Sequence, residues 1–335
     1  MAAPIDAARS VRWGILGAGA IAATVGRDIA GSDGNEVVAV GSRDAGRAAT
    51  FADRHGIGRS YGSYAELVAD PDIDVIYIAT THGQHHEHAL LALRAGKPIL
   101  VEKAFTLNAR QAAEVVACAR AADLFCMEAM WLRVNPLILR ARELARSGRI
   151  GTVIGVRADL SKRFDYDPAH RLFDLAAGGG ALLDLGVYPV NFAWLVLGRP
   201  DSVQATGSLA PTGTDVTVAM QWHYADGRFA QLQSSAAGNS PYAGLVTGTD
   251  GWIRINDRLH RPGSITIRSG DDEETILAGP GDNTYRAEIA EVARCLRAGL
   301  IESPAVPLDD TVDILELLDG VRGQLGVSYP TDEQE

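Results

Sequence analysis

Hydrophobic and polar positions follow two alternating periods along the first 130 residues. Short runs of β-branched and other apolar residues recur, and segments with helical spacing separate them. The runs are apolar enough to be covered on both faces, which is typical of strands in a parallel sheet. The alternation therefore predicts βαβ units, with strands at residues 11–16, 36–41, 74–80, 98–102 and 124–127.

Capping signals support helices between these strands. Asp44 is a candidate N-cap, Ser63 opens an S-x-x-E capping box, and Asn108 opens a looser version of it. Gly96 and Gly148 stand where C-terminal caps belong. The first part of the chain is thus predicted to be α/β, an N-terminal Rossmann domain with a doubly wound parallel sheet.

After residue 149 the pattern changes to consecutive strand-like segments joined by turns. Asp226-Gly227 and Asp250-Gly251 mark two of the turns, and residues 271–274 are expected to form an acidic turn. Strands joined by turns predict a C-terminal α+β domain with a mostly antiparallel open sheet. The expected strands are 153–161, 202–208, 216–224, 228–235, 244–248, 252–255 and 265–268. The expected domains are 1–128 and 129–335.

Composition narrows the classes of partner. The chain has 335 residues, 47% of them hydrophobic, and a formal net charge of -11. An acidic surface argues against nucleic-acid and anionic-membrane partners. Three cysteines without a close pair indicate reduced thiols, and no long apolar segment or leader pattern occurs. We therefore expect a soluble, cytoplasmic protein with a small-molecule substrate.

A G-x-G-x-x-A motif directly follows the first predicted strand. Gly17 permits a tight turn, Gly19 lets a pyrophosphate approach the backbone, and Ala22 allows close packing of helix on strand. Ala20 and Ile21 open the helix, whose N-terminus favours phosphate. The motif predicts dinucleotide binding; the alternative is a glycine-rich turn without a ligand.

The second predicted strand ends in residues that favour NADP. Ser42 and Arg43 stand where an NAD enzyme usually has an acidic residue, and Arg47 lies one helical turn further on. Two guanidinium groups and a hydroxyl suit a 2'-phosphate. The alternative is that Asp44 binds the ribose in an NAD enzyme.

A histidine-rich segment follows the third long strand. Thr80, His82 and His85 lie at the carboxyl edge of the sheet and are candidate cofactor-binding residues, whereas His86 and His88 are expected to be solvated. The segment lacks the ligand spacing of a zinc site, so we expect no metal.

The fourth long strand brings Glu102 and Lys103 to the same edge. The positive charge of an oxidised nicotinamide favours the neutral amine of a nearby lysine, which suits proton exchange with a substrate hydroxyl. The alternative is a surface Glu-Lys pair. Asp184 and Tyr188 are four apart on an apolar helix and share a face, either as site residues or as satisfied core residues.

These motifs together resemble the glucose-fructose oxidoreductase and inositol dehydrogenase (Gfo/Idh/MocA) family, and within it the dimeric dihydrodiol dehydrogenases and NADP xylose dehydrogenases. The matching stretches cover nearly the whole chain: 14–19, 42–44, 61–64, 81–85, 102–103, 127–133 with Pro136, 179–184 with Tyr188, and 302–304. The resemblance implies a dehydrogenase that transfers hydride between nicotinamide and a sugar, polyol or cyclic diol. It also implies a homodimer through the open face of the C-terminal sheet.

The resemblance assigns roles to individual residues. Lys103 and Tyr188 would serve proton transfer, Asp184 would orient them, and His85, Trp131 and Arg133 would border the nicotinamide and substrate.

One position departs from the family, whose relatives usually read Glu-Lys-Pro where this chain has Ala104. Alanine resists a cis peptide by about 2.5 to 4 kcal/mol, so this departure bears on how Lys103 is oriented. Two other functions stay open on this fold: an NAD(P)-dependent glycosidase, and a protein that senses nicotinamide without turnover.

Overall fold

The computed structural model describes residues 5–6, 8–241 and 243–332, and the chain divides into two compact units. The first unit contains the described residues up to Met130 together with Thr284–Asp313. The second contains Trp131–Asn283 and the described residues from Ile314 onward. The sequence predicts one crossing between domains at residue 128, without the return of residues 284–313 to the first unit.

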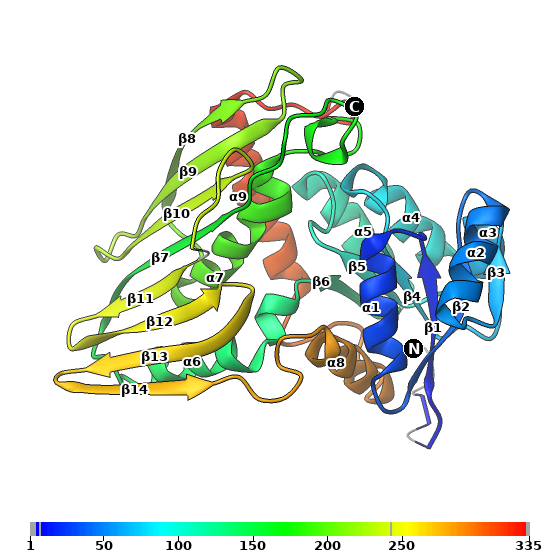
Figure 1. Ribbon diagram of the computed structural model, residues 1–335, viewed down its shortest axis with the longest axis horizontal. Helices are drawn as coiled ribbons and strands as arrows, with labels where there is room; N and C mark the ends of the chain where they lie inside the picture. Colours follow the sequence, from blue (N-terminus) through cyan, green and yellow to red (C-terminus); the bar gives the residue numbers. More distant parts are fainter. Residues whose placement is uncertain (1–4, 7, 242, 333–335) are drawn as a thin grey trace. The chain divides into compact units, whose positions relative to one another are not determined.

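The first unit is built on a six-stranded parallel sheet in the order β3-β2-β1-β4-β5-β6 (Figure 1). Its strands are β1 (Val11–Leu16), β2 (Asn35–Gly41), β3 (Arg59–Tyr61), β4 (Val75–Ile78), β5 (Ile99–Glu102) and β6 (Cys126–Ala129). Its helices include α1 (Ala20–Ala30), α2 (Ala45–His55), α3 (Tyr64–Ala69), α4 (His82–Arg94), α5 (Ala109–Ala121) and α8 (Arg286–Arg297). The predicted Rossmann fold is confirmed.

The helix starts of this unit follow the capping signals. The side chain of Asp44 accepts a hydrogen bond from the backbone N–H of Arg47, and Ser63 accepts one from Glu66. Asn108 likewise accepts from the N–H of Gln111. Each cap satisfies a backbone donor that the helix itself cannot pair.

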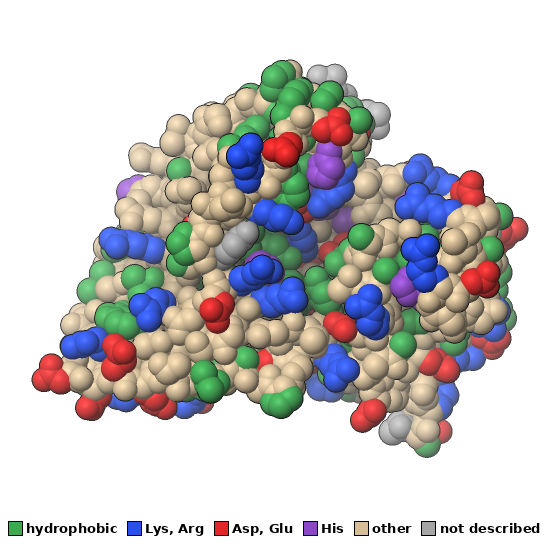
Figure 2. Space-filling view, in the orientation of Figure 1, with side chains coloured by type: hydrophobic (Ala, Val, Ile, Leu, Met, Phe, Trp, Pro, Cys, Tyr) green, Lys and Arg blue, Asp and Glu red, His purple; other side chains and the backbone are tan. Residues whose placement is uncertain are grey.

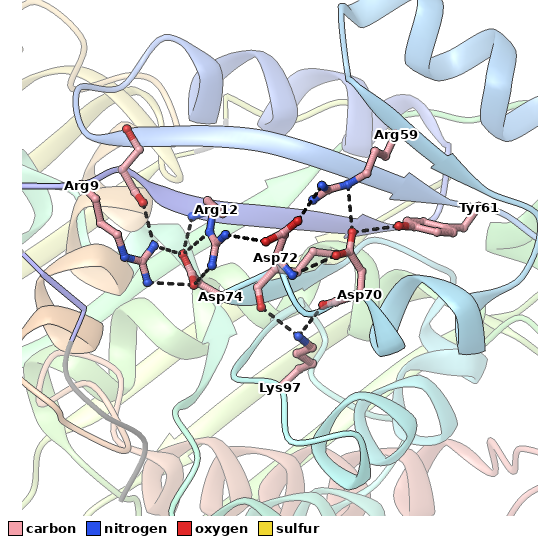
Figure 3. Close-up of polar contacts among 10 residues, drawn as sticks. Arg9, Arg12, Arg59, Tyr61, Asp70, Asp72, Asp74 and Lys97 are labelled. Carbon is pink, nitrogen blue, oxygen red and sulfur yellow. Dashed lines mark hydrogen bonds and ion pairs between the residues drawn. The ribbon is translucent and has the colours of Figure 1, made fainter.

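An ion-pair network ties together the amino ends of the strands (Figure 3). Arg12 of β1 binds both Asp72 and Asp74, while Arg59 of β3 binds Asp72. Nζ of Lys97, just before β5, donates to two backbone carbonyls, those of Asp70 and Ile73. These contacts stabilise the edge of the sheet opposite the one where Gly17 and Glu102 lie.

The second unit is built on an eight-stranded sheet in the order β14-β13-β12-β11-β7-β10-β9-β8 (Figure 1). Its strands are β7 (Val153–Ser161), β8 (Ser202–Leu209), β9 (Asp215–His223), β10 (Phe229–Ser235), β11 (Gly244–Gly248), β12 (Gly251–Arg258), β13 (Arg261–Ser269) and β14 (Asp272–Leu277). All neighbours pair antiparallel except β7 and β10. The predicted mostly antiparallel sheet is confirmed. The acidic turn expected at 271–274 is only partly right, because Asp271 lies in the turn between β13 and β14 whereas residues 272–274 begin β14.

Helices lie on one face of this sheet. They include α6 (Pro136–Arg146), α7 (Val187–Leu197) and the part of α9 (Leu308–Leu325) from Ile314 onward, with short helical turns η1 (Trp131–Val134), η2 (Arg171–Phe173) and η3 (Leu182–Gly186). α7 is buried along nearly its whole length and contacts both β7 and β10. It therefore forms the centre of the core of this unit.

Charged side chains of both signs are spread across the molecular face drawn in Figure 2. The net charge of -11 is thus not gathered into one patch on this face. Within the described part of the chain, every helix is too short or too polar to span a membrane.

Candidate active site

The turn between β1 and α1 leaves the helix N-terminus open. Gly17 has a φ of 113°, and a Cβ there would lie 2.9 Å from the carbonyl oxygen of Ala79. Gly19 is the N-cap of α1, no heavy atom lies within 4 Å of where its Cβ would be, and Ala22 is fully buried. The backbone N–H groups at Ala20 and beyond therefore have the small-residue surroundings that a pyrophosphate needs.

The end of β2 places polar groups beside this turn. Arg47 donates from Nη2 to the carbonyl oxygen of Ala18 at 3.2 Å, which holds its guanidinium over the turn. Ser42 is buried, and its Oγ accepts from the N–H of Asp44 at 3.3 Å. Asp44 uses its Oδ1 to cap α2. The carboxylate proposed for ribose binding in an NAD enzyme is thus engaged in a local structural contact.

The positive charges of Arg43 and Arg47 both act on the phenol of Tyr64. Burial raises the pKa of the Tyr64 phenol, while the positive charges of Arg43 and Arg47 oppose that shift. The rings of Tyr64 and His88 pack edge to face with 4.6 Å between their centroids, and Nδ1 of His88 lies 3.0 Å from Thr80 Oγ1. The motifs had not singled out Tyr64 as a site residue, because nothing in its local sequence marks a tyrosine that faces arginines from another element.

The prediction that His88 is solvated is wrong. His88 is 4% exposed, and burial followed by the charge of Arg43 lowers its pKa to about 4. His86, in contrast, is 23% exposed and pairs with Glu114, with 2.8 Å between Nε2 of His86 and Oε2 of Glu114. The sequence does not show that α3 packs on α4, and this packing buries His88.

His82 and His85 support the backbone that follows β5. Nε2 of His82 lies 3.1 Å from the carbonyl oxygen of Lys103, and Nδ1 of His85 lies 2.8 Å from that of Ala104. The other ring nitrogen of His85 faces the carbonyl oxygen of Thr80 at 3.1 Å. His85 is fully buried, and this burial lowers its pKa to about 4. The peptide bond between Lys103 and Ala104 is cis.

Buried acidic groups lie behind Lys103. Glu102 accepts a hydrogen bond from the Tyr77 hydroxyl and another from the N–H of Lys103. Glu128 accepts from the N–H of Phe105 at 3.3 Å. These two carboxylates therefore hold the backbone on both sides of the Lys103–Ala104 peptide.

Glu288 of α8 completes this acidic group. Its side chain is fully buried, and the pKa of its carboxyl is raised well above the usual range by burial and by the negative charges of Glu102 and Glu128. Tyr77, also fully buried, has a pKa raised by burial and by Glu102. The predicted cofactor-binding residue Glu102 thus belongs to a buried network that positions the Lys103 segment.

In the second unit, Tyr188 lies in a cluster of aromatic side chains. Trp131 donates from Nε1 to the Tyr188 hydroxyl at 3.1 Å. The ring of His260 packs on Tyr188 at 4.9 Å between centroids and on Trp131 at 5.7 Å. Tyr188 and Trp131 are 7% and 4% exposed, and Arg133, in the same helical turn as Trp131, is 4% exposed. The structure thus brings together the predicted residues Tyr188 and Trp131.

Asp184 is paired with a residue that the motifs did not identify. Both of its carboxylate oxygens accept hydrogen bonds from Arg171, at 3.1 to 3.3 Å. Asp184 lies in η3, a π-helical turn with i→i+5 bonding, so the α-helical spacing assumed between Asp184 and Tyr188 does not hold there. No motif surrounds Arg171 in the sequence, and only the fold brings it to the carboxylate.

Three glycines and a buried aspartate set the start of the helical segment that carries Asp184 and Tyr188. Gly178 and Gly180 have φ values of 75° and 130°, and a Cβ at Gly179 would lie 2.5 Å from the carbonyl oxygen of Leu172. A Cβ at Gly180 would collide with the carboxylate of Asp215, which accepts from the N–H of Leu182 at 2.6 Å. Asp215 therefore requires a glycine at position 180, whereas the backbone of Leu172 requires one at position 179.

The open face of the eight-stranded sheet carries a broad cavity of about 780 Å³. Residues of β7, β8, β9, β10 and β11 line it, and the partly or fully exposed ones include apolar and amide side chains, among them Ala219, Leu245, Gln221 and Gln231. Among the described residues, no group of three or more histidine, cysteine or acidic side chains is arranged to hold a metal ion.

Comparison with known proteins covers both units. Residues 11–130 match the Gfo/Idh/MocA oxidoreductase family with its NAD-binding Rossmann fold, and residues 138–254 match a C-terminal domain of the same family. Among curated proteins, trans-1,2-dihydrobenzene-1,2-diol dehydrogenase of Mus musculus is 38% identical, with 97% of this chain and 100% of that protein covered. The Bos taurus enzyme of the same name is 36% identical, with 97% and 99% covered.

Solved structures share the complete fold. A 3-ketoreductase from Actinomadura kijaniata, in complex with NADP and TDP-benzene, has a TM-score of 0.85 at 25% identity, covering 96% of this chain and 99% of that one. A levoglucosan dehydrogenase, in complex with NADH and levoglucosan, has a TM-score of 0.86 at 20% identity, covering 95% and 98%. At that lower identity the likeness concerns the fold alone.

Proposed function

Because the chain belongs to the Gfo/Idh/MocA oxidoreductase family, we propose that it is an NADP-dependent dehydrogenase of cyclic diols, sugars or polyols. The family resemblance drawn from the motifs is confirmed. Its relatives carry dehydrogenase names, and the chain is an enzyme that acts on CH–OH groups. The finer parts of the proposal concern the cofactor, the substrate, the residues that move protons and the assembly.

The positive charges of Arg43 and Arg47, which both act on the Tyr64 phenol, support the proposed preference for NADP. Both guanidinium groups act on the same phenol, and Arg47 is held by the carbonyl oxygen of Ala18. Two arginines and a phenolic hydroxyl offer charge-assisted hydrogen bonds to a 2'-phosphate. Asp44, which would favour a ribose hydroxyl, is used as a helix cap.

Binding measurements with the free enzyme test this preference. Arg43→Ala and Arg47→Ala should each weaken NADPH binding about 10- to 100-fold, as expected for a lost hydrogen bond to a charged group, with little change for NADH. Arg54→Ala is a matched control, because Arg54 is an exposed arginine of the same helix α2. Calorimetric titration gives both dissociation constants. Equal losses of affinity for NADPH and NADH would refute the proposal that these arginines bind the 2'-phosphate.

For the chemistry, we propose that Tyr188, as the phenolate, accepts the proton of the substrate hydroxyl and that Lys103 takes part in the same proton transfer. The bound nicotinamide supplies the hydride acceptor. Tyr188 accepts a hydrogen bond from Trp131, and such a bond favours the phenolate over the phenol. Asp184 forms an ion pair with Arg171, and we propose that this pair orients the segment that carries Asp184 and Tyr188.

We propose a cyclic diol as the first substrate to test. The relatives named above are trans-1,2-dihydrobenzene-1,2-diol dehydrogenases, and the rings of Trp131 and His260 beside Tyr188 suit a ring-shaped substrate. Reduction of NADP should therefore occur with trans-1,2-dihydrobenzene-1,2-diol, with D-xylose as the sugar comparison. Lys103→Met and Tyr188→Phe should each lower kcat at least about 100-fold, as expected for lost general acid-base catalysis, while NADPH affinity changes little. Unchanged turnover in both variants would refute these roles.

The open sheet face supports a homodimer as the assembly. A contiguous cavity lined by apolar and amide side chains is typical of a surface that another chain covers. Sedimentation should therefore give twice the mass of 35.5 kDa, and Leu245→Arg should give the monomer, because Leu245 is a partly exposed residue of this face. A monomeric wild type would refute this part of the proposal.

A further inference from the structure

Resting on the proposed function, we propose that His260 is a positioning residue for Tyr188. Its ring holds the phenol so that the hydroxyl accepts the hydrogen bond of Trp131 and turns its own proton elsewhere. His260 lies far from Tyr188 in the sequence and in none of the motifs that define the site.

The contacts around Tyr188 set the direction of its proton. An indole N–H is only a donor, so the Tyr188 oxygen is the acceptor in the 3.1 Å bond from Trp131. The phenolic proton must then point away from Trp131. The His260 ring packs on the Tyr188 ring with 4.9 Å between centroids and a tilt of 35°, and it packs edge to face with the Trp131 ring at 5.7 Å between centroids. The imidazole thus touches both partners of this bond and restricts rotation of the phenol.

An irregularity in the β12–β13 hairpin places His260 beside Tyr188. His260 is in the two-residue turn between β12 and β13, and the strand register shifts between Asn256 and Asp257. Asp257 has a φ of 65°, which is uncommon for a residue other than glycine. A Cβ at Gly263, opposite this shift, would collide with the Asp257 carboxylate. Such bulges redirect side chains near active sites, and here the redirected turn carries His260.

The turn is also anchored in the core. Leu259, the residue before His260, is fully buried. A Cβ at Gly244 of β11 would lie 2.7 Å from Leu259 Cδ1, so the absence of a side chain at Gly244 makes room for Leu259. An anchored turn holds the imidazole in one place, as a positioning residue requires.

Hydrogen exchange of the Trp131 indole N–H tests the proposal without a substrate. The resonance is assigned by its loss in Trp131→Phe. His260→Ala should speed exchange roughly five- to tenfold, as Tyr188→Phe does, because one hydrogen bond is weakened in each. His260→Phe keeps a ring and should restore slow exchange, whereas His260→Gln should behave as the alanine variant. His223→Ala, which removes an exposed histidine of the same unit, should change nothing.

Turnover supplies the second readout, measured with NADP and trans-1,2-dihydrobenzene-1,2-diol. His260→Ala should lower kcat about tenfold or more with KM for NADP unchanged, as a misplaced catalytic group does. In a Tyr188→Phe background the same substitution should cost no further turnover, since the group that it positions is gone.

The two readouts separate the possible failures. Indole exchange unchanged in His260→Ala, or an equal loss of kcat with and without Tyr188, would overturn the role of His260. If the wild type does not oxidise the diol, or if Tyr188→Phe retains full kcat, the proposed function fails, and the exchange measurement still decides the role of His260.

Discussion

Replacing Asp215 with asparagine should change how stability depends on pH. Asp215 is 1% exposed and accepts the N–H of Leu182 where the segment carrying Asp184 and Tyr188 begins. Burial raises its pKa from 3.8 to about 6, even though bonds from backbone N–H groups oppose the shift. Asparagine has nearly the same shape and does not titrate in this range.

The two pKa values give the size of the effect. Between pH 3.8 and 6 the folded protein holds a proton that the unfolded chain has released, so stability from this group falls as pH rises. The contribution is fully present below pH 3.8 and lost above about pH 6. A difference of about 2 units corresponds to about 3 kcal/mol. The wild type should therefore lose about 3 kcal/mol relative to Asp215→Asn between pH 3.8 and 7.

Urea unfolding followed by circular dichroism, at half-unit steps from about pH 4 to 8, measures the difference between the two proteins. Subtraction removes the titration of all other groups. Asp226→Asn is the control, because Asp226 is fully exposed and backbone and side-chain contacts with Arg228 lower its pKa. A difference curve for Asp215→Asn that is flat, or that rises with pH, would refute the burial argument.

Three further substitutions address neighbouring features. Gly180→Ala should destabilise the protein by about 1–3 kcal/mol in urea unfolding, because its φ is 130° and a Cβ would meet Asp215; equal stability would contradict this. Glu288→Gln should become more stable relative to the wild type as pH rises. The pKa of the buried Glu288 carboxyl is raised in the folded protein, so the wild type loses stability once this carboxyl ionises in the unfolded chain; parallel pH curves for the two proteins would disprove this. Arg171→Ala should cost about 1–2 kcal/mol at neutral pH by removing the donors to Asp184, with Arg171→Lys between the two; an alanine variant as stable as the wild type would show that the pair contributes nothing.

Local sequence was sufficient where local physics decides the structure. The parallel strands, the caps at Asp44, Ser63 and Asn108, and the Gly17 turn depend on neighbours within a few residues. β3 was missed because it has only three residues, none of them fully buried, so no apolar run announces it. The start of β14 has the sequence pattern of an acidic turn, because its acidic residues are exposed on a sheet edge.

The candidate site was predictable only in part. Motifs and the family resemblance make Lys103 and Tyr188 candidate site residues, but the groups that surround them come from distant segments. Glu288, Arg171 and His260 reach their places through the packing of α8, η2 and the β12–β13 hairpin. Side-chain periodicity contains no information on such long-range contacts, so sequence reasoning could not find them.

The return of Thr284–Asp313 to the first unit has a consequence for synthesis on the ribosome. The backbone N–H of Cys126 in β6 donates to the carbonyl of Ile301, and Glu288 is buried in this unit. At a translation rate of roughly 5–20 residues per second, Glu288 and Ile301 are synthesised about ten seconds or more after β6. During translation of the second sheet, the nascent cofactor-binding unit therefore has one sheet edge incompletely covered. This exposed edge is a surface that chaperones can bind.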